Sequence, residues 1–312
     1  MSILPERYNA YSNFLKDKFG TRVHKIPVNA GFTCPNRDGT VATGGCTYCN
    51  IDSFTRKDAR ARIPIRRQIE SSMAYFKQRY KATSFIVYFQ PYTNTYAPLE
   101  QLQQIYEQAL FHPDIVGLSV GTRTDCIDDK KLDYFDELAR DYFVTLEYGI
   151  ESAFDDTLRL INRGHDYQCT VDGIKRSALR NFHVCGHVVL GFPNENLDQM
   201  MTTVHEVSKL PLDIIKLHNL HIVRYTELAR QYEERPFHIF TFEEWVQVAC
   251  DALERMNPDF IVERLHGDAP YKLLIEPRWC RDGARLLYAI QKELERRDSY
   301  QGKYFNKKKM AA

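Results

Sequence analysis

Short apolar runs rich in β-branched and aromatic residues alternate with segments of helical periodicity over most of the chain. From the second run onward, successive runs start 30, 28, 39 and 31 residues apart. A strand followed by a helix about every thirty residues is the βαβ period, which predicts six parallel strands in a barrel or in an open doubly wound sheet. The runs begin near Val23, Phe85, Ile115, Phe143, Phe182 and Asp213. The helical segments cover residues 64–80, 98–110, 129–140, 154–162, 167–180 and 195–209.

This alternation stops near residue 222. Helical patterns continue over residues 225–234, 241–256 and 283–298, with a candidate strand at residues 259–264. No glycine- or serine-rich linker separates this part from the rest. The sequence therefore predicts a core domain with its N-terminal lead-in over residues 1–222. Residues 223–312 are expected to form an α-rich C-terminal extension that packs on the core and is not independent.

Composition and charge narrow the class of protein. Of the 312 residues, 44% are hydrophobic and 27% are charged, which is typical of a soluble globular protein. The formal net charge is +1, so an anionic partner would have to meet a local basic patch. No run of 18 apolar residues and no apolar core of a signal peptide is present. We therefore expect a cytoplasmic protein that does not span a membrane.

Three of the eight cysteines fall within sixteen residues, directly after the first predicted strand. Cys34, Cys46 and Cys49 have the spacing Cys-x11-Cys-x2-Cys in a segment dense in Gly, Pro, Asn and Asp. Such residues allow a loop to bend sharply, so the three thiolates can converge on one point. Thiolates are the usual ligands of iron–sulfur clusters. A four-iron cubane held by three protein ligands leaves one iron open to a cofactor or a substrate.

Two other uses of these cysteines stay open. A structural zinc site could take a nearby histidine such as His24 as its fourth ligand, and Cys46 with Cys49 could form a redox pair. Neither explains why the loop opens a series of βα units, whose carboxyl strand ends carry the active sites of barrels. The five remaining cysteines are predicted to be buried, and only Cys126, near a strand end, is a possible exception.

At this point the sequence resembles the radical S-adenosylmethionine (SAM) superfamily, whose usual signature is Cys-x3-Cys-x2-Cys with an aromatic residue before the last cysteine. Tyr48 fills the aromatic position, and the longer first gap is similar to that of the elongator catalytic subunit, a tRNA wobble-uridine enzyme. Further stretches resemble that subunit in the same order, some of them shared with the oxygen-independent coproporphyrinogen oxidases. These stretches are residues 120–125, 147–152, 161–166, 187–193 and 222–228.

The resemblance implies a fold, two cofactors and a set of contacts. The fold is a partial (β/α)6 TIM-like barrel, and a [4Fe–4S] cluster on Cys34, Cys46 and Cys49 presents its fourth iron to SAM. A one-electron donor of the flavodoxin or ferredoxin type would drive reductive cleavage of SAM to a 5′-deoxyadenosyl radical. The implied SAM contacts are Tyr48, Gln90, Arg123, Glu151, Arg163 and Gly191.

The chain also departs from the family pattern. The glycine-rich motif after the second strand, which often ends in Glu, is replaced by residues 88–91, and Gln90 is left to reach the SAM amino group. The family Glu after the third strand is Gly121, and the family Gln of the fourth strand is Glu151. The contacts to the SAM ribose therefore carry over least directly. His187 is predicted to be a core histidine. No catalytic residue is identified, and the roles of Cys126, His165, His218 and His221 stay open.

The substrate is less defined than the chemistry. The elongator-like stretches favour tRNA, with a wobble uridine as the target, and a basic segment after the cysteine loop is a candidate contact to the RNA backbone. The aromatic loop at residues 92–96 could stack on a base or pack in the core. The alternatives are a small metabolite such as a tetrapyrrole precursor, and a zinc- or cluster-binding protein without catalytic activity. The basic segment contains Arg56, Lys57, Arg60, Arg62, Arg66 and Arg67.

Overall fold

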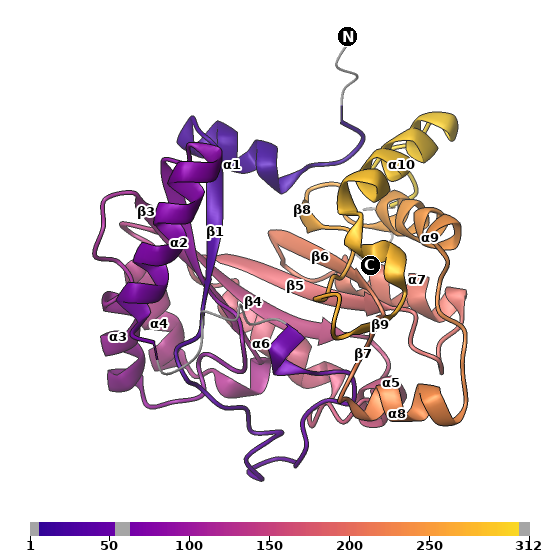
Figure 1. The fold of residues 1–312 in the computed structure, drawn as a ribbon, viewed down its shortest axis with the longest axis horizontal. Helices are drawn as coiled ribbons and strands as arrows, with labels where there is room; N and C mark the ends of the chain where they lie inside the picture. The colour runs from indigo at the N-terminus through magenta and orange to yellow at the C-terminus, as the bar shows by residue number, and fades with distance from the viewer. Residues whose placement is uncertain (1–5, 54–62, 306–312) are drawn as a thin grey trace.

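The computed structural model describes residues 6–53 and 63–305 and contains one large parallel sheet (Figure 1). Seven strands lie in the order β1-β2-β3-β4-β5-β6-β8, and every neighbouring pair is parallel. The strands are β1 (Val23–Val28), β2 (Ser84–Phe89), β3 (Ile115–Thr122), β4 (Phe143–Glu151), β5 (His183–Leu190), β6 (Ile214–Asn219) and β8 (Ile261–Arg264). The helices between them are α2 (Ile65–Tyr80), α3 (Leu99–Glu107), α4 (Asp129–Leu138), α5 (Asp155–Leu160), α6 (Tyr167–Ser177) and α7 (Leu197–Val207).

The sheet is curled into a half-barrel, which confirms the predicted partial TIM-like barrel. Helix α1 (Tyr11–Phe19) contacts both β1 and β8, the two edge strands, at their amino ends. A parallel bridge between Ala10 and Val262 joins the same regions. One helix can reach both edges only because the sheet curves toward itself. The prediction of six parallel strands is corrected to seven, since β8 of the C-terminal part pairs with β6.

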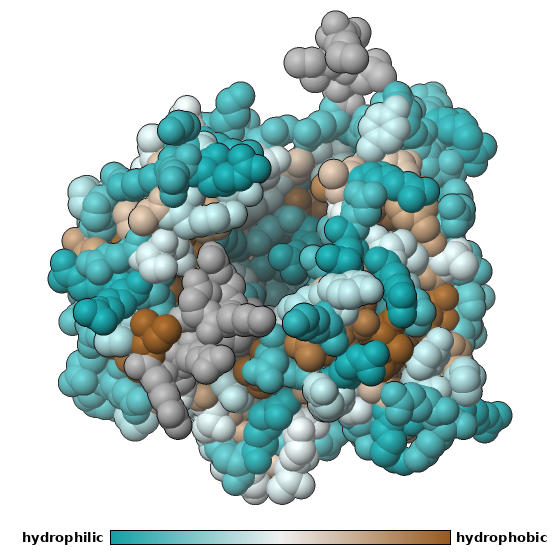
Figure 2. Space-filling model, viewed as in Figure 1, coloured by the Kyte–Doolittle hydropathy of each residue, from teal (hydrophilic) through white to brown (hydrophobic). Residues whose placement is uncertain are grey.

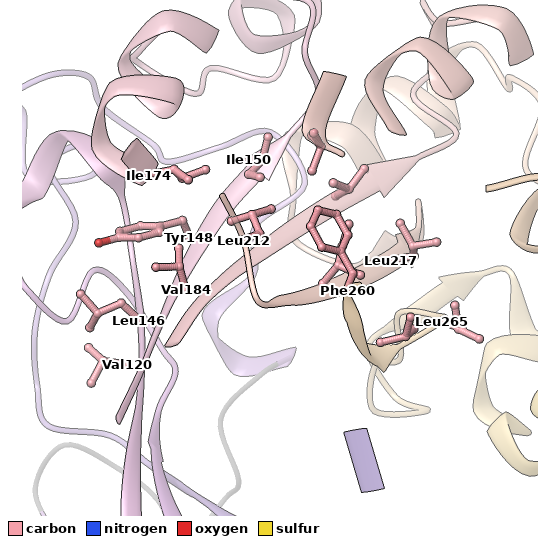
Figure 3. Close-up of a cluster of buried hydrophobic side chains, with 14 of the residues drawn as sticks. Val120, Leu146, Tyr148, Ile150, Ile174, Val184, Leu212, Leu217, Phe260 and Leu265 are labelled. Atoms are coloured by element: carbon pink, nitrogen blue, oxygen red, sulfur yellow. The ribbon is translucent and has the colours of Figure 1, made fainter. Parts of the chain in front are cut away.

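The main core lies between the convex face of the sheet and the helices. Alternate residues of β4 point to this side, among them Leu146, Tyr148 and Ile150, and they pack with Ile174 of α6 (Figure 3). The Tyr148 hydroxyl lies 2.7 Å from Ser177 Oγ, so the one polar atom of this ring has a partner. Alternation along parallel strands therefore sends one set of side chains to the helices and the other into the half-barrel.

Side chains on the concave face form layers from the amino to the carboxyl ends of the strands. The lowest layer is apolar and packs on Tyr11 and Leu15 of α1. The next layer is charged and includes Lys25, Glu147 and Lys216. Above this layer, the loops that follow the carboxyl ends of the strands surround the inside of the half-barrel. The apolar layer contains Ile86, Phe143, Cys185 and Ile214.

The helices begin where short polar side chains accept the first free backbone N–H groups. Asp128 and Asp166 accept from the third residues of α4 and α6. Asn196 and Thr241 form capping boxes at the start of α7 and α9 (Phe242–Arg255). These residues explain why the predicted helices agree with the observed ones to within a few positions.

The C-terminal part completes the half-barrel. Trp245 on α9 is fully buried and donates its indole N–H to the Leu265 carbonyl at 2.9 Å, just after β8. Helix α10 (Gly283–Arg296) packs on α9, and α8 (Glu227–Glu234) follows β7 (Ile222–Val223). Strand β7 pairs with β9 (Leu274–Glu276) in a separate antiparallel sheet. The candidate strand at residues 259–264 is thus confirmed as β8.

Within the described ranges, none of the helices combines the length and the apolar character that a bilayer crossing requires.

Candidate functional site

The cysteine loop connects β1 to α2 at the carboxyl end of the half-barrel. Arg37 N–H donates to the Cys34 carbonyl at 2.8 Å, and Cys49 N–H donates to the Cys46 carbonyl at 2.9 Å, so each end of the loop is a tight turn. Gly45 has a φ of +85°, and a Cβ there would lie 2.8 Å from Arg37 Nε. The glycine is therefore required both by the turn and by the close approach of the arginine.

Neighbouring segments fix the position of the loop. Thr47 N–H donates to the Ile161 carbonyl at 2.9 Å, and the Thr47 carbonyl accepts from Leu228 N–H at 2.8 Å. The buried Asn36 amide donates to the carbonyls of Asn162 and Arg163 at 2.6 and 2.8 Å. The loop is thus tied to the turn after α5 and to the start of α8, which explains how a segment without helix or strand presents its thiols in one place.

The three thiols lie close enough to influence one another. Burial raises the pKa of Cys49 to about 11, and the charges of Cys46 and Cys34 act in the same direction, while Arg37 opposes them. Asn36 Nδ2 is 3.7 Å from Cys46 Sγ. Three crowded sulfurs form a site for a cationic group that several of them can share, as an iron–sulfur cluster requires.

His24 is not part of this site. Its ring packs on the outer face of β1 against Phe76 and Tyr80, with ring centroids 5.1 and 5.6 Å away. The zinc alternative that used His24 as the fourth ligand is therefore wrong.

The cysteines open onto a cavity on the concave face of the sheet. Figure 2 shows this hollow in the middle of the molecule with hydrophilic side chains around it. Five of the six predicted SAM contacts line it, namely Tyr48, Gln90, Arg123, Glu151 and Arg163. Gly191, the sixth, is not among the lining residues, because the ring of Phe240 lies over it: a Cβ there would be 3.1 Å from the ring.

Arg163 is the buried cation beside the cysteines. Its guanidinium lies 3.9 Å from Glu151 Oε1, donates to the Gly149 carbonyl at 2.6 Å and approaches Cys46 Sγ to 3.9 Å. Burial opposes its charge, but Glu151 and Cys46 hold its pKa above the usual range. Its Nε is buried without a hydrogen-bond partner in the described structure. A buried donor of this kind is costly unless a ligand satisfies it, and a carboxylate would do so.

Arg123 has a protein partner for each of its three guanidinium nitrogens, unlike Arg163. It donates to both carboxylate oxygens of Asp125 at 2.8 and 2.7 Å and to the Arg163 carbonyl at 2.8 Å. The predicted role of Arg123 as a direct cofactor contact is untested, and the geometry gives it a second role in positioning Arg163.

Two family models match consecutive parts of the chain. The model described as the Radical SAM superfamily matches residues 34–207, and that of the Radical_SAM C-terminal domain matches residues 212–296. The chain belongs to the radical SAM superfamily. It is therefore an enzyme whose cofactors are a [4Fe–4S] cluster and SAM, as the resemblance implied.

Two proteins and one solved structure show what this radical SAM chain is similar to. The uncharacterized protein YtqA of Bacillus subtilis (strain 168) is 38% identical over 302 residues, which are 97% of this chain and 94% of the relative. The tRNA uridine(34) acetyltransferase of Methanocaldococcus infernus is 23% identical over 181 residues, 57% of this chain but 33% of the relative. The solved structure of Elp3 from that archaeon, with an N-terminal deletion, has a TM-score of 0.63 over 89% of this chain and 64% of that chain. Its identity is 17%, so it shows a shared fold.

Below the cofactor site of this radical SAM enzyme, two lysines and two glutamates form a buried network. Lys25 Nζ lies 2.8 Å from Glu147 and 2.7 Å from Glu263, and Lys216 Nζ lies 2.5 Å from Glu147 and 3.0 Å from Glu263. The Glu147 side chain is fully buried. Burial alone would raise its pKa, but the two lysines hold it well below the usual range. The Tyr88 ring lies against both ammonium groups, at 5.1 and 4.8 Å.

Glu147 lies in the middle of β4. The sequence pattern did not lead us to Lys25, Lys216 or Glu263. The signal was present, since each lysine is the single charge in an apolar strand and faces the inside of the half-barrel. His187, predicted to be a core histidine, has its Nε2 2.9 Å from Glu147 and also lines the cavity.

Glu147, Cys185 and His187 come close enough to hold a metal ion, with ligand atoms within 4.8 Å of one another. The lysine ammonium groups on Glu147 already supply the positive charge there. We therefore assign this group to the ion network and not to a metal.

The histidines with open roles fall into two groups. His218 and His221 line the cavity, and the buried Nε2 of His218 has no hydrogen-bond partner among the described residues. Burial and nearby Arg264 hold the pKa of His218 well below the usual range, so its ring is neutral. His165 does not line the cavity. Burial and Arg163 lower the pKa of His165 to about 4.

The isolated cysteines are mostly buried, as expected. Burial raises the pKa of Cys126 to about 12, so this thiol is not reactive near neutral pH, and it does not line the cavity. The prediction that Cys169 is buried is wrong, since this residue is partly exposed on α6.

The basic segment is only partly within the described structure. Arg56, Lys57, Arg60 and Arg62 lie outside the described residues. Arg66 lies in the first turn of α2, with its Nε 3.0 Å from Glu70 Oε1. In the aromatic loop, residues 93–95 are buried, and Tyr92 and Thr93 line the cavity.

Proposed function

We propose that Cys34, Cys46 and Cys49 bind three irons of the [4Fe–4S] cluster and that the enzyme modifies tRNA at the wobble uridine. The observation that carries the first part is the convergence of three thiols beside a buried guanidinium with an unpartnered Nε. The second part is supported by similarity to a tRNA uridine(34) acetyltransferase over 57% of the chain. Such an enzyme would meet its substrate in the cytoplasm.

The residues of the cavity have distinct parts in this proposal. When bound, the cluster and SAM supply methionine and a 5′-deoxyadenosyl radical after transfer of one electron from a flavodoxin- or ferredoxin-type donor. Arg163, whose Nε has no partner among the described residues, would hold the SAM carboxylate, and the Gln90 carbonyl oxygen would accept from the SAM amino group. Arg123 positions Arg163 by donating a hydrogen bond to the Arg163 backbone carbonyl.

One part of the cavity wall is apolar. The partly buried Tyr48 ring packs 6.0 Å from that of Phe192, and it stays neutral because burial and Glu151 hold its pKa well above the usual range. Val189 and Leu220 add apolar surface. A dry wall of this kind limits quenching of a reactive radical by solvent.

The experiment uses protein purified without oxygen and reconstituted with iron and sulfide. It is incubated with SAM, dithionite and tRNA from cells that lack its gene, and the tRNA nucleosides are then analysed by mass spectrometry. The proposal predicts that tRNA increases 5′-deoxyadenosine formation and that one wobble nucleoside changes in mass. Stimulation by a fraction of small metabolites, with tRNA unchanged, would overturn the tRNA assignment.

A further inference from the structure

The small sheet β7–β9 carries an exposed aromatic and basic end. Because its strands are antiparallel, the residues after β7 and those before β9 lie at the same end. Arg224 N–H donates to the Leu273 carbonyl at 2.8 Å, which continues the pairing beyond β7. Tyr225 and Tyr271, one on each segment, are therefore neighbours in the fold, as Figure 1 shows for the strands themselves.

This end of the sheet borders the cysteine loop. Asn50, the residue after Cys49, donates its side-chain amide to the Arg224 carbonyl at 2.7 Å. Ile51, which follows Asn50, and Asp268, which comes three residues before Tyr271, both line the cavity. The aromatic end is thus part of the rim through which a substrate would enter.

Tyr225 is unusual for its place in the fold. Its side chain is 88% exposed, and its φ of +64° lies in the left-handed region. A tyrosine with this backbone is strained and gains little from burial, whereas Gly or Asn would fit the turn better. Residues held in such conformations cluster at functional sites. Neither packing nor backbone preference accounts for the ring.

Tyr271 belongs to the same surface and is 63% exposed, with the Arg281 guanidinium 4.8 Å from its ring centre. The nearby carboxylate of Asp282 instead accepts from the backbone N–H of Arg285. The exposed cations of this surface form no ion pair within the described parts of the chain, in contrast to cations elsewhere such as Arg230, which contacts two glutamates. The unpaired cations are Arg224, Lys272 and Arg281.

We infer that this surface binds a single-stranded RNA loop whose target base enters the cavity. This inference rests on the proposed function and adds the contact surface for the RNA. Exposed aromatic rings stack on unpaired bases, and unpaired cations neutralise phosphates. An enzyme that reacts at one base must take that base out of its stack, so rings beside the cavity would hold the neighbouring nucleotides.

Two variants test the surface, with a matched control at the other end of the barrel. The first is Tyr225→Gly, and the second combines Tyr271→Ala with Arg281→Gln. The control combines Tyr304→Ala with Arg255→Gln, because Tyr304 is 59% exposed and Arg255 lies 6.0 Å from its ring centre. Tyr304 N–H donates to the Glu254 carbonyl at the end of α9. This position lies near the amino end of β8, whereas the cavity opens at the carboxyl ends of the strands.

Binding of bulk bacterial tRNA to the reconstituted enzyme is measured at several salt concentrations, with thermal unfolding of each variant. Tyr225→Gly should weaken binding about tenfold and leave the unfolding temperature equal or higher, since it relieves the strain. The double variant should weaken binding and lower the salt slope by about 0.7 for the lost phosphate contact. The control should bind as the wild type does.

Two results would contradict the inference in different ways. If the wild type binds tRNA and both surface variants bind it equally well, the surface is overturned and the proposed function stands. If the wild type binds no tRNA, the surface and the tRNA assignment fall together.

Discussion

At the scale of single residues, Lys216 shows how the half-barrel keeps charges inside. Its side chain is 2% exposed and contacts both Glu147 and Glu263. Each carboxylate is buried, and each is held ionised by the same two lysines. Removing one partner of such a group leaves an uncompensated charge, which costs more than the pair itself contributes.

Lys216→Met should therefore lower the free energy of unfolding by about 3–5 kcal/mol at pH 7.5. In the wild type the pKa of each glutamate is lowered by folding, so their stabilisation is present above about pH 4.5 and is lost as the pH falls below it. In the variant the remaining charges favour protonation, so its deficit relative to wild type should shrink between pH 7.5 and pH 5. Urea unfolding at both pH values measures this.

The control is Lys209→Met, which removes a partly exposed pair with Glu206. It should cost about 0.5 kcal/mol or less at either pH. A Lys216→Met loss equal to that of the control would contradict the account of the network.

At the scale of elements, the end of β4 shapes the cofactor site. The register shifts between Gly149 and Glu151, and Glu151 has a φ of +68°. This bulge turns the Glu151 carboxylate toward Arg163. A Cβ on Gly149 would lie 2.3 Å from Glu151 Oε1 and 2.7 Å from Arg163 Nη2. The glycine therefore makes room for the pair.

Gly149→Ala should displace Arg163 and weaken SAM binding to the reconstituted enzyme about tenfold, the effect of losing one charge-assisted contact. Its control is Gly20→Ala, where the φ is +68° and no atom lies within 4 Å of the added Cβ. That change should cost about 1–2 kcal/mol of stability through backbone strain and leave SAM affinity intact. Equilibrium dialysis with SAM and thermal unfolding separate the two effects. Equal SAM affinity in both variants would count against the role of the bulge.

Elements were easier to predict from the sequence than their contacts. The strand–helix period and the helix caps are local, so most elements followed from the pattern, and the cysteine spacing with Arg163 marked the site. The pairing of Lys25 with Glu263 spans 238 residues and depends on the order and curl of the strands, which no local pattern contains. The sequence predicted Gly191 as a cavity residue because no local pattern shows that the ring of Phe240, from the C-terminal part, lies over it.

At the scale of the whole molecule, the C-terminal part supplies pieces that the core needs. Strand β8 covers the edge of β6 and brings Glu263 to the two lysines. We therefore keep the proposal that residues 223–312 are not an independent domain. A chain ending at residue 222 would expose the β6 edge and leave two buried cations with one carboxylate.

Such a truncated chain should be poorly soluble and should unfold without a cooperative transition. Circular dichroism during heating measures this, with the full chain as control. A truncated chain that melts cooperatively near the temperature of the full chain would contradict the interdependence of the two parts.

The central claim is that Cys34, Cys46 and Cys49 together hold the cluster at which SAM is cleaved. The most direct measurement is the iron content and 5′-deoxyadenosine yield of anaerobically reconstituted protein with SAM and dithionite, for wild type and for Cys34→Ala, Cys46→Ala and Cys49→Ala. Cys250→Ala, at a buried cysteine of α9, is the control. We predict about four irons per chain and deoxyadenosine in the wild type and control, and no deoxyadenosine in the other three variants. Full cleavage activity in any of those three would contradict the claim.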